Sequence, residues 1–311
     1  MMGFGKELDF GPSFFYRVLL PGAILAGLAN PLLAPYLASV GANAADIQVW
    51  VVLVAAVVIG ILLSALNDPI YQFYEGRRGW WGPAAAWRTR HWQRHVAALL
   101  AKAQDARTAG RTVTYDEIWS ELRQFPEDDA GNPTATRPTK MGNILASYEL
   151  YPERRYGMDS VFYWYRLWLC IDKDTREEVD RTWASTDALM YLAFGMAVLG
   201  VVYLATVASA VATTYLGAPW FIPAGDQARY AIGGVALVTL SYLPYWLSMP
   251  GHRKNGEFYK TLFDLYRSKL RTELSAASDA ERKEWTALWS QLQYGVKPAA
   301  DGEDKQTSRN T

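Results

Sequence analysis

The stretch that decides the fold is VWVVLVAAVVIGILLSAL, residues 49–66, a nearly unbroken run of Val, Leu, Ile and Ala. In water, such a β-branched composition favours a strand. In a lipid bilayer, only a helix satisfies every backbone polar group within one segment. About 20 apolar residues in a helix cross the hydrocarbon core. The run therefore predicts a membrane-spanning helix, which we place at residues 47–67.

Three further windows of the chain lack charged side chains. The uncharged lengths between Arg17 and Asp46, Asp46 and Asp68, Asp187 and Asp226, and Arg229 and Arg253 are 28, 21, 38 and 23 residues. Each meets the length that a bilayer requires. We expect spans near residues 18–40, 47–67, 188–215 and 230–249. The first contains Pro21, Pro31 and Pro35, which predict a bent or partly broken helix because proline removes a backbone donor.

Basic residues set the orientation. Of the 31 Lys and Arg residues, 2 lie in residues 1–17, 17 in residues 75–187 and 11 after Pro250, whereas the connectors 41–46 and 217–229 hold only Arg229. Cytoplasmic loops carry the excess of basic residues, so both termini and the middle region are predicted to be cytoplasmic. A cleaved signal peptide is the alternative for the first span, and Glu7 and Asp9 in the leader oppose it.

The composition of the 311-residue chain narrows the function classes. Lys plus Arg and Asp plus Glu both number 31, which gives zero formal net charge. This balance argues against a bulk nucleic-acid binder, and no nucleic-acid partner is expected. The single cysteine, Cys170, excludes an intramolecular disulfide and fits a reducing compartment.

The predicted fold class is all-α, with four transmembrane helices in two hairpins. A helical cytoplasmic domain lies between spans 2 and 3, and a helical cytoplasmic tail follows span 4. The predicted boundaries are 1–17 for the cytoplasmic N-terminus, 18–74 for hairpin 1, 75–187 for the cytoplasmic domain, 188–250 for hairpin 2, 251–296 for the tail and 297–311 for a disordered end.

Local signals predict the cytoplasmic helices. We expect a helix over 84–108, a second from a capping box at Thr114, a loop over 126–138, and a helix over 140–151 that ends before Pro152. A polar helix from Asp174 or Thr175 should continue into the third span, and two amphipathic helices should occupy 257–294. Asp159 should cap the apolar segment 160–171, which is either the core of the domain or an interfacial element.

A basic, tryptophan-rich segment follows the second span. From Arg77 to Arg111 there are eight basic residues and one acid, Asp105. One interpretation is an interfacial helix held by anionic headgroups; the other is a packed helix with a solvated basic face. The residues expected to contact anionic lipid are Arg77, Arg78, Trp80, Trp81, Arg88, Arg90 and Arg94.

The sequence contains few motifs for catalysis, phosphate binding or metal binding. His91 and His95 are one helical turn apart, but the neighbouring Arg90 and Arg94 oppose a divalent ion. There is no phosphate-binding glycine loop, nucleophile elbow or H-E-x-x-H. No catalytic residue, metal or cofactor is therefore assigned.

Two polar segments stand out. The first is NDPIYQFYEG, residues 67–76, in which Asp68, Tyr71 and Glu75 share one face of a helix at the inner membrane boundary. They indicate either a cation-attracting mouth or headgroup site, or a simple end of the span with Asp68 paired to Arg77, Arg78 or another cytoplasmic Arg.

The second segment, residues 137–159, concentrates cations, acids and tyrosines. It is either a pocket for a phosphate or lipid headgroup or an internal polar network. The candidate ligand-binding residues are Lys140, Asn143, Glu149, Arg154, Arg155, Tyr156 and Asp159.

Together, NDPIYQFYEG and RPTKMGNILASYELYPERRYGMDSVF resemble segments of a group of bacterial membrane proteins of no assigned function. In that group, an acidic EG follows a span, and R-P-T-x-x-G-N and R-Y-G-x-D lie between two pairs of spans. The match covers roughly residues 60–170. The resemblance implies a bacterial inner-membrane location and marks both segments as defining features, but it implies no activity.

Three functions remain open. The first is a non-enzymatic membrane protein, an adaptor or membrane-acting effector, whose cytoplasmic domain senses or docks a protein partner. The second is an oligomeric ion channel, in which small residues at Gly195, Gly200, Ala205 and Ala208 pack between helices or subunits. The third is an interfacial enzyme acting on lipid or nucleotide through carboxylates such as Glu149 and Asp159. Anionic membrane lipids and a second copy of the chain are the other expected partners.

Overall fold

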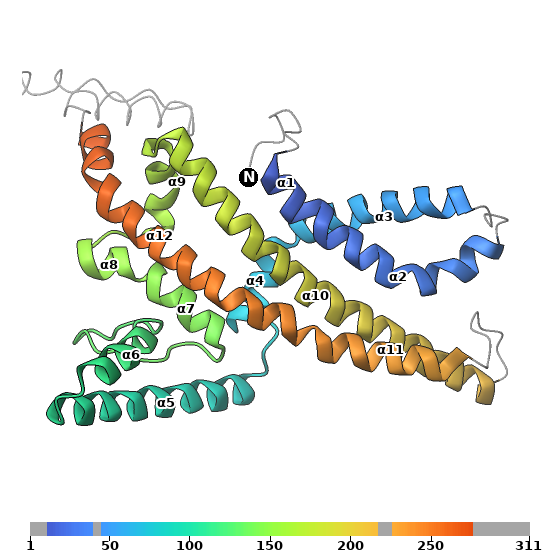
Figure 1. Ribbon diagram of the computed structural model, residues 1–311, viewed down its shortest axis with the longest axis horizontal. Helices are drawn as coiled ribbons and strands as arrows, with labels where there is room; N and C mark the ends of the chain where they lie inside the picture. Colours follow the sequence, from blue (N-terminus) through green and yellow to red (C-terminus); the bar gives the residue numbers. More distant parts are fainter. Residues whose placement is uncertain (1–10, 40–44, 217–225, 276–311) are drawn as a thin grey trace, which may run out of the picture.

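The computed structural model describes residues 11–39, 45–216 and 226–275. These residues are helical, apart from turns, loops and an isolated β-bridge between Glu127 and Pro133. Figure 1 shows an elongated molecule, with the N-terminal helices, drawn in blue, at one end and the green helices of the middle of the chain at the other, and the long yellow and orange helices run between them. The all-α prediction is confirmed for the described residues.

The N-terminal helices form one layer. The order is α1 (Pro12–Phe14), a π-helical turn η1 (Phe15–Leu19), α2 (Leu20–Ser39) and α3 (Ala45–Ala65). The π-turn ends just before Pro21, whose missing N–H disfavours the regular pattern there. α2 continues past Pro31 and Pro35 without a break, and Figure 1 shows it bending toward its C-terminal end. The helix is therefore bent, as predicted.

Two glycines bring α3 against η1 and α2. A Cβ added to Gly22 would lie 1.9 Å from the carbonyl oxygen of Ala56, and one added to Gly60 would lie 2.1 Å from that of Val18. No side chain larger than hydrogen fits at either position. Small residues allow such close approach of helices in membranes, so this seam fixes how α2 and α3 cross.

The chain turns sharply after α3. α4 (Asn67–Glu75) is bent from the preceding helix by 60°. It ends at Gly76, whose φ of 82° lies in the left-handed region that favours glycine. α4 therefore does not continue the line of α3 but directs the chain across its end.

α5 (Gly82–Thr108) and α6 (Thr112–Leu122) form a small helical unit. Val96, Leu99 and Ala103 pack with Leu122 and Phe125 in its core. α6 begins at Thr112, earlier than the capping box at Thr114 predicted, because the turn around Gly110 already starts the helix. In the view of Figure 1, α5 lies roughly parallel to the long axis, with its N-terminal end toward the side of α2 and α3.

Three helices follow the loop: α7 (Lys140–Glu149), α8 (Tyr151–Tyr156) and α9 (Ser160–Cys170). The helix predicted over 140–151 ends at Glu149, and Pro152 lies in the first turn of α8, where proline is tolerated. Asp159 caps α9 as predicted, with Oδ1 accepting a hydrogen bond of 2.9 Å from the Phe162 N–H. Leu167 and Cys170 are buried in a core with Tyr259 and Phe263. The other face of α9 is exposed.

The C-terminal part contains the longest helices. α10 (Lys173–Leu216) has 44 residues, α11 (Gln227–Leu240) has 14 and α12 (Tyr242–Ser275) has 34. α10 joins the polar helix and the third predicted span, as expected. The first predicted tail helix is not a separate element, because α12 continues through Pro250 to Ser275. The second lies outside the described residues.

Glycine contacts also join these helices. A Cβ on Gly200 would lie 2.8 Å from the Gly234 carbonyl oxygen, and one on Gly234 would lie 3.0 Å from the Gly200 carbonyl oxygen. Between the two layers, a Cβ on Gly195 would lie 2.2 Å from Leu25 Cδ1. α10 therefore packs closely on both α11 and α2.

By length and composition, three helices of the described chain qualify as membrane spans: Pro12–Ala34, Lys173–Val211 and Gln227–Glu273. The bent pair Val49–Ala65 and Asn67–Glu75 gives a fourth if it is counted as one span. This pattern is that of a multi-pass membrane protein.

Candidate functional site

The two polar segments that stand out in the sequence meet in the structure. A Cβ on Gly76, at the end of α4, would lie 2.2 Å from Pro138 Cγ. A Cβ on Gly142, in α7, would lie 2.2 Å from the Glu75 carbonyl oxygen. The Glu75-Gly76 pair therefore packs directly on the RPTKMGN segment: the Gly76 backbone lies against the Pro138 side chain, and the Glu75 carbonyl lies against Gly142. Both glycines are required by this close packing. We call this contact between α4 and α7 the junction.

Thr139 and Asn143 build the α7 side of the junction. The Thr139 hydroxyl accepts a hydrogen bond from the Gly142 N–H and caps the helix. Asn143 is fully buried; its Oδ1 accepts from the N–H groups of Thr136 and Arg137, and its Nδ2 donates to the carbonyls of Arg137 and Thr139. All of these partners are backbone groups. Asn143 therefore fixes the loop before α7 and is not a free ligand-binding group.

Arg77 connects the ends of α4 and α7. Its guanidinium lies 2.5 Å from Glu149 Oε2 and 2.5 Å from Glu75 Oε2; in the second contact the geometry is that of an ion pair without an aligned hydrogen bond. Glu75 is buried, and desolvation raises its pKa from 4.5 to about 7 although Arg77 opposes the shift. Glu75 is thus a buried carboxyl group with a raised pKa at the C-terminal end of α4.

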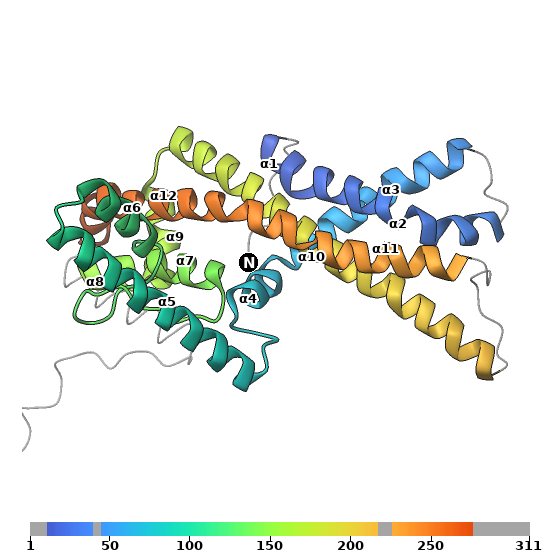
Figure 2. The same ribbon diagram turned by 60° about the horizontal axis from the view of Figure 1, so that its bottom comes forward.

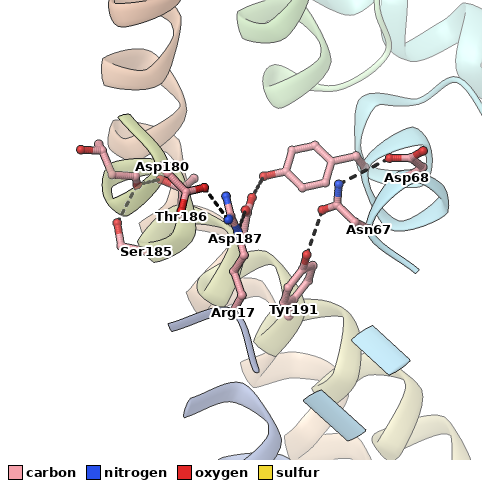
Figure 3. A network of polar contacts seen from close by, with 10 residues as sticks. Arg17, Asn67, Asp68, Asp180, Ser185, Thr186, Asp187 and Tyr191 are labelled. Carbon is pink, nitrogen blue, oxygen red and sulfur yellow. Dashed lines mark hydrogen bonds and ion pairs between the residues drawn. The ribbon is translucent and has the colours of Figure 1, made fainter. Parts of the chain in front are cut away.

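A second polar network joins the beginning of the chain to α10. The Nε of Arg17 lies 2.8 Å from Asp187 Oδ2, and its NH1 lies 2.6 Å from Asp180 Oδ1. The Tyr71 hydroxyl donates to Asp187 Oδ1 over 2.5 Å. Figure 3 shows Arg17 and Asp187 facing each other. One carboxylate on α10 therefore binds η1 and α4 at the same time.

Beside this network, the Tyr191 hydroxyl donates to Asn67 Oδ1 over 3.0 Å. Asp68 is exposed, and its Oδ1 accepts a hydrogen bond of 3.5 Å from Asn67 Nδ2. The predicted mouth of Asp68, Tyr71 and Glu75 is thus divided, because Tyr71 faces α10 and Glu75 faces α7. Among the described residues, Asp68 forms no ion pair with Arg77, Arg78 or another Arg, and Arg77 binds Glu75 and Glu149 instead.

α12 closes the junction from the other side. A Cβ on Gly251 would lie 2.4 Å from Thr186 Oγ1, and one on Gly256 would lie 2.5 Å from Tyr148 Cδ1. His252 is buried with its ring edge-on to Tyr71 at 5.8 Å. Among the described residues, His252 Nε2 has no hydrogen-bond partner. This face of α12 is therefore held mainly by packing.

The remaining candidates of residues 137–159 do not converge on one pocket. Lys140 lies near Arg253, and burial together with that cation lowers its pKa. Arg154 donates to the Asp128 carbonyl, and the Tyr156 hydroxyl donates to Asp264. Arg155 is exposed, and Asp159 caps α9. Arg154, Tyr156 and Asp159 therefore bind other parts of the chain, and a headgroup or phosphate site in this segment stays a prediction.

Arg17, Asp180 and Asp187 were not among the sequence candidates. The signal was present, because Asp180 and Asp187 are seven residues apart and share one face of a helix that continues into a span. An acidic pair at that depth requires a cation, and Arg17 is the only one in residues 7–76.

In the part of the chain that the structure describes, His, Cys, Asp and Glu form no group of three that could hold a metal ion. The carboxylates and cations of the junction and of the Arg17 network bind one another. This arrangement is suited to fixing helices relative to each other. Comparisons with protein-family models, with curated proteins and with solved structures found no match to this chain.

Proposed function

We propose that the chain is an integral protein of the bacterial inner membrane with a cytoplasmic helical domain that docks a protein partner. Four spans in two hairpins hold the domain at the membrane, and both termini are cytoplasmic. The protein is a non-enzymatic adaptor or membrane-acting effector. The observation that carries the proposal is the unbroken course of α10 from the spans into the cytoplasmic helices.

The apolar surfaces of the predicted spans support their placement in lipid. α3 exposes a broad set of large apolar side chains, among them Leu53, Val54, Val57, Val58, Ile61 and Leu62. A soluble protein rarely exposes so large a contiguous apolar area. The charge-free windows and the one-sided distribution of Lys and Arg support the same placement and orientation.

Continuous helices support mechanical coupling between the spans and the domain. α10 has 44 residues and is about 66 Å long at 1.5 Å per residue. Its cytoplasmic part contacts α12, which also continues from the fourth span. The Arg17 network and the junction attach η1, α4 and α7 to these two helices. A displacement at either end is therefore passed to the other.

The docking surface is the exposed face of α9, formed by Val161, Phe162, Tyr165 and Leu169. Their exposed fractions lie between 55% and 77%. Residues 161, 165 and 169 recur every four positions and form one stripe, whereas Leu167 on the opposite side is fully buried. We propose that an amphipathic helix of a partner protein packs its apolar face on this stripe.

The channel hypothesis receives less support. Gly195 and Gly200 are used within the chain, against Leu25 and Gly234, so they are not free to pack between subunits. Ala205 and Ala208 remain exposed on α10. Assembly of several copies through that face stays a prediction. The interfacial-enzyme hypothesis is weakened in the same way, because Glu149 binds Arg77 and Asp159 caps a helix.

The test uses a photo-cross-linking amino acid at Val161 in the full chain in cells, with the same amino acid at Ala98, exposed on α5, as the matched control. We expect a discrete adduct with another protein from position 161 only, lost in Leu169→Ser. A cross-link between two copies of this chain would show that the α9 face mediates self-association and does not bind another protein. Absence of adducts together with conductance in planar bilayers would favour the channel.

Orientation is tested separately. Reporters fused at either terminus should be active only in the cytoplasm, and the protein should stay in the membrane pellet after alkaline extraction. A periplasmic terminus or release into the supernatant would overturn the membrane placement.

A further inference from the structure

The corner between α4 and α5 has a distinctive charge and aromatic content. From Gly76 to Gln104 the chain contains six Lys or Arg residues and no Asp or Glu. The corner itself, residues 76–94, also contains Trp80, Trp81, Trp87 and Trp92. Basic residues next to tryptophans are typical of surfaces that contact membrane headgroups.

Two of these tryptophans project outward. Trp81 is 75% exposed and Trp87 is 58% exposed. Trp80 is instead fixed, with Nε1 donating to the Phe73 carbonyl over 2.9 Å. An indole with an apolar body and one N–H donor is stabilised where hydrocarbon meets polar headgroups. Trp81 and Trp87 are therefore suited to an interface and are not needed for the core.

The corner between α4 and α5 lies where the proposed membrane–water interface would be. α4 follows directly after α3, and the linker to α5 begins at Gly76. Tyr74, near the end of α4, stacks on Tyr245 with ring centroids 5.2 Å apart, and Tyr245 lies at the inner end of the fourth predicted span. On the same turn of α12, Tyr242 and Trp246 are exposed. Figure 2 shows the N-terminal end of α5 projecting sideways from the long axis, beside α4.

The basic residues of the corner differ in their ion pairs. Arg77 forms ion pairs with Glu75 and Glu149. Among the described residues, Arg78, Arg88 and Arg90 form no ion pair with a carboxylate, and Arg88 lies over the rings of Trp87 and Trp92 at 5.9 and 6.0 Å. Three positive charges thus lie beside two exposed indoles without acidic partners.

We propose that this corner binds the headgroups of anionic phospholipids in the cytoplasmic leaflet, with Arg78, Arg88 and Arg90 on the phosphates and Trp81 and Trp87 in the interface. The proposal rests on the membrane placement proposed above but not on α9. Packing of the second half of α5 on α6 means that only the beginning of the helix meets the lipid. The far end, with Lys102 and Arg107, remains in the cytoplasm.

The experiment measures phosphatidylglycerol bound to the full-length protein in mild detergent by native mass spectrometry. The variant Arg78→Gln/Arg88→Gln/Arg90→Gln is compared with Lys102→Gln/Arg107→Gln/Arg111→Gln, which removes equal charge at and just beyond the far end of α5. We expect the apparent dissociation constant to rise at least about tenfold in the first variant, since each cation near an anionic surface contributes severalfold. The control should stay within about twofold of wild type.

Further measurements distinguish lipid binding from binding of a soluble phosphate and from a nonspecific effect of charge. Brominated phosphatidylglycerol should quench less tryptophan fluorescence in Trp81→Phe/Trp87→Phe than in wild type, and brominated phosphatidylcholine should show a smaller difference. Competition by inorganic phosphate at millimolar concentration would reassign the site to a soluble phosphate. Equal weakening in both charge variants would overturn the proposal. If the triple variant fails to fold, Arg78→Gln/Arg90→Gln, at two exposed positions, replaces it. A protein that is membrane-inserted but shows no lipid preference disproves this inference alone.

Discussion

Arg17 forms an ion pair with Asp187, which follows it by 170 residues, with Nε 2.8 Å from Oδ2. The contact joins the start of the first predicted span to the start of the third predicted span in α10. Asp187 also accepts from Tyr71 on α4. Three elements that are distant in the chain are therefore held by one carboxylate.

Asp187→Asn should destabilise the protein by about 2 kcal/mol, because Arg17 is left partly buried with reduced compensation. Asp180→Asn is the matched control and should have a much smaller effect. The side chain of Asp180 is 39% exposed, whereas that of Asp187 is 13% exposed, and exposed pairs contribute little. Thermal unfolding in detergent, followed by intrinsic fluorescence, measures the difference. An equal loss in both variants would contradict the ranking.

Gly22→Ala should destabilise the crossing of α2 and α3 by about 1–3 kcal/mol, because the new Cβ would overlap the Ala56 carbonyl oxygen and force the helices apart. Gly27, in the same helix, has open space at its Cβ position. Gly27→Ala should be neutral or stabilising by up to about 1 kcal/mol, since alanine favours a helix. The thermal midpoint should therefore fall in Gly22→Ala and stay unchanged or rise in Gly27→Ala.

Asn143→Ala should cost about 3 kcal/mol, because several buried backbone groups lose their partner. The loop over 126–138 should become a site of early cleavage in limited proteolysis. Asn132→Ala, an exposed position in the same loop, is the control and should leave the digestion pattern unchanged. Resistance of the loop in Asn143→Ala would mean that Thr139 alone fixes it.

The pKa of Glu75, raised from 4.5 to about 7, makes stability depend on pH. Because the folded protein holds a proton that the unfolded chain releases, this contribution is complete below about pH 4.5 and is lost as pH rises through 7. Glu75→Gln removes the dependence, on the order of 1–3 kcal/mol between pH 5 and 8. Thermal midpoints across that range measure it. Asp105→Asn, at an exposed position, should keep the wild-type slope.

Local features of the fold could be predicted from the sequence. The charge-free windows locate the apolar helices, because the length that lipid requires leaves few alternatives. The Asp159 cap and the loop over 126–138 follow from short-range hydrogen bonding and turn residues. These features depend on a few neighbouring residues, so no knowledge of tertiary contacts is needed.

The candidate site could be predicted only in part. The segments around Glu75 and Asn143 stood out by composition, but their direct contact through Gly76 and Pro138 depends on packing across 60 residues. The partners of Arg17 lie still further along the chain. The continuity of α12 could not be predicted, because its apolar and polar stretches indicate separate helices, whereas Pro250 does not interrupt the helix.

The separation of Arg17 from its acidic partners has a consequence for biosynthesis. Ribosomes release the chain from its N-terminus, so Arg17 and the α2–α3 pair emerge long before Asp180 and Asp187 exist. The glycine seam between α2 and α3 uses only nearby residues and is complete at that time. The first pair of helices is therefore translated before Arg17 can form its ion pairs with Asp180 and Asp187, which only the later translation of α10 supplies.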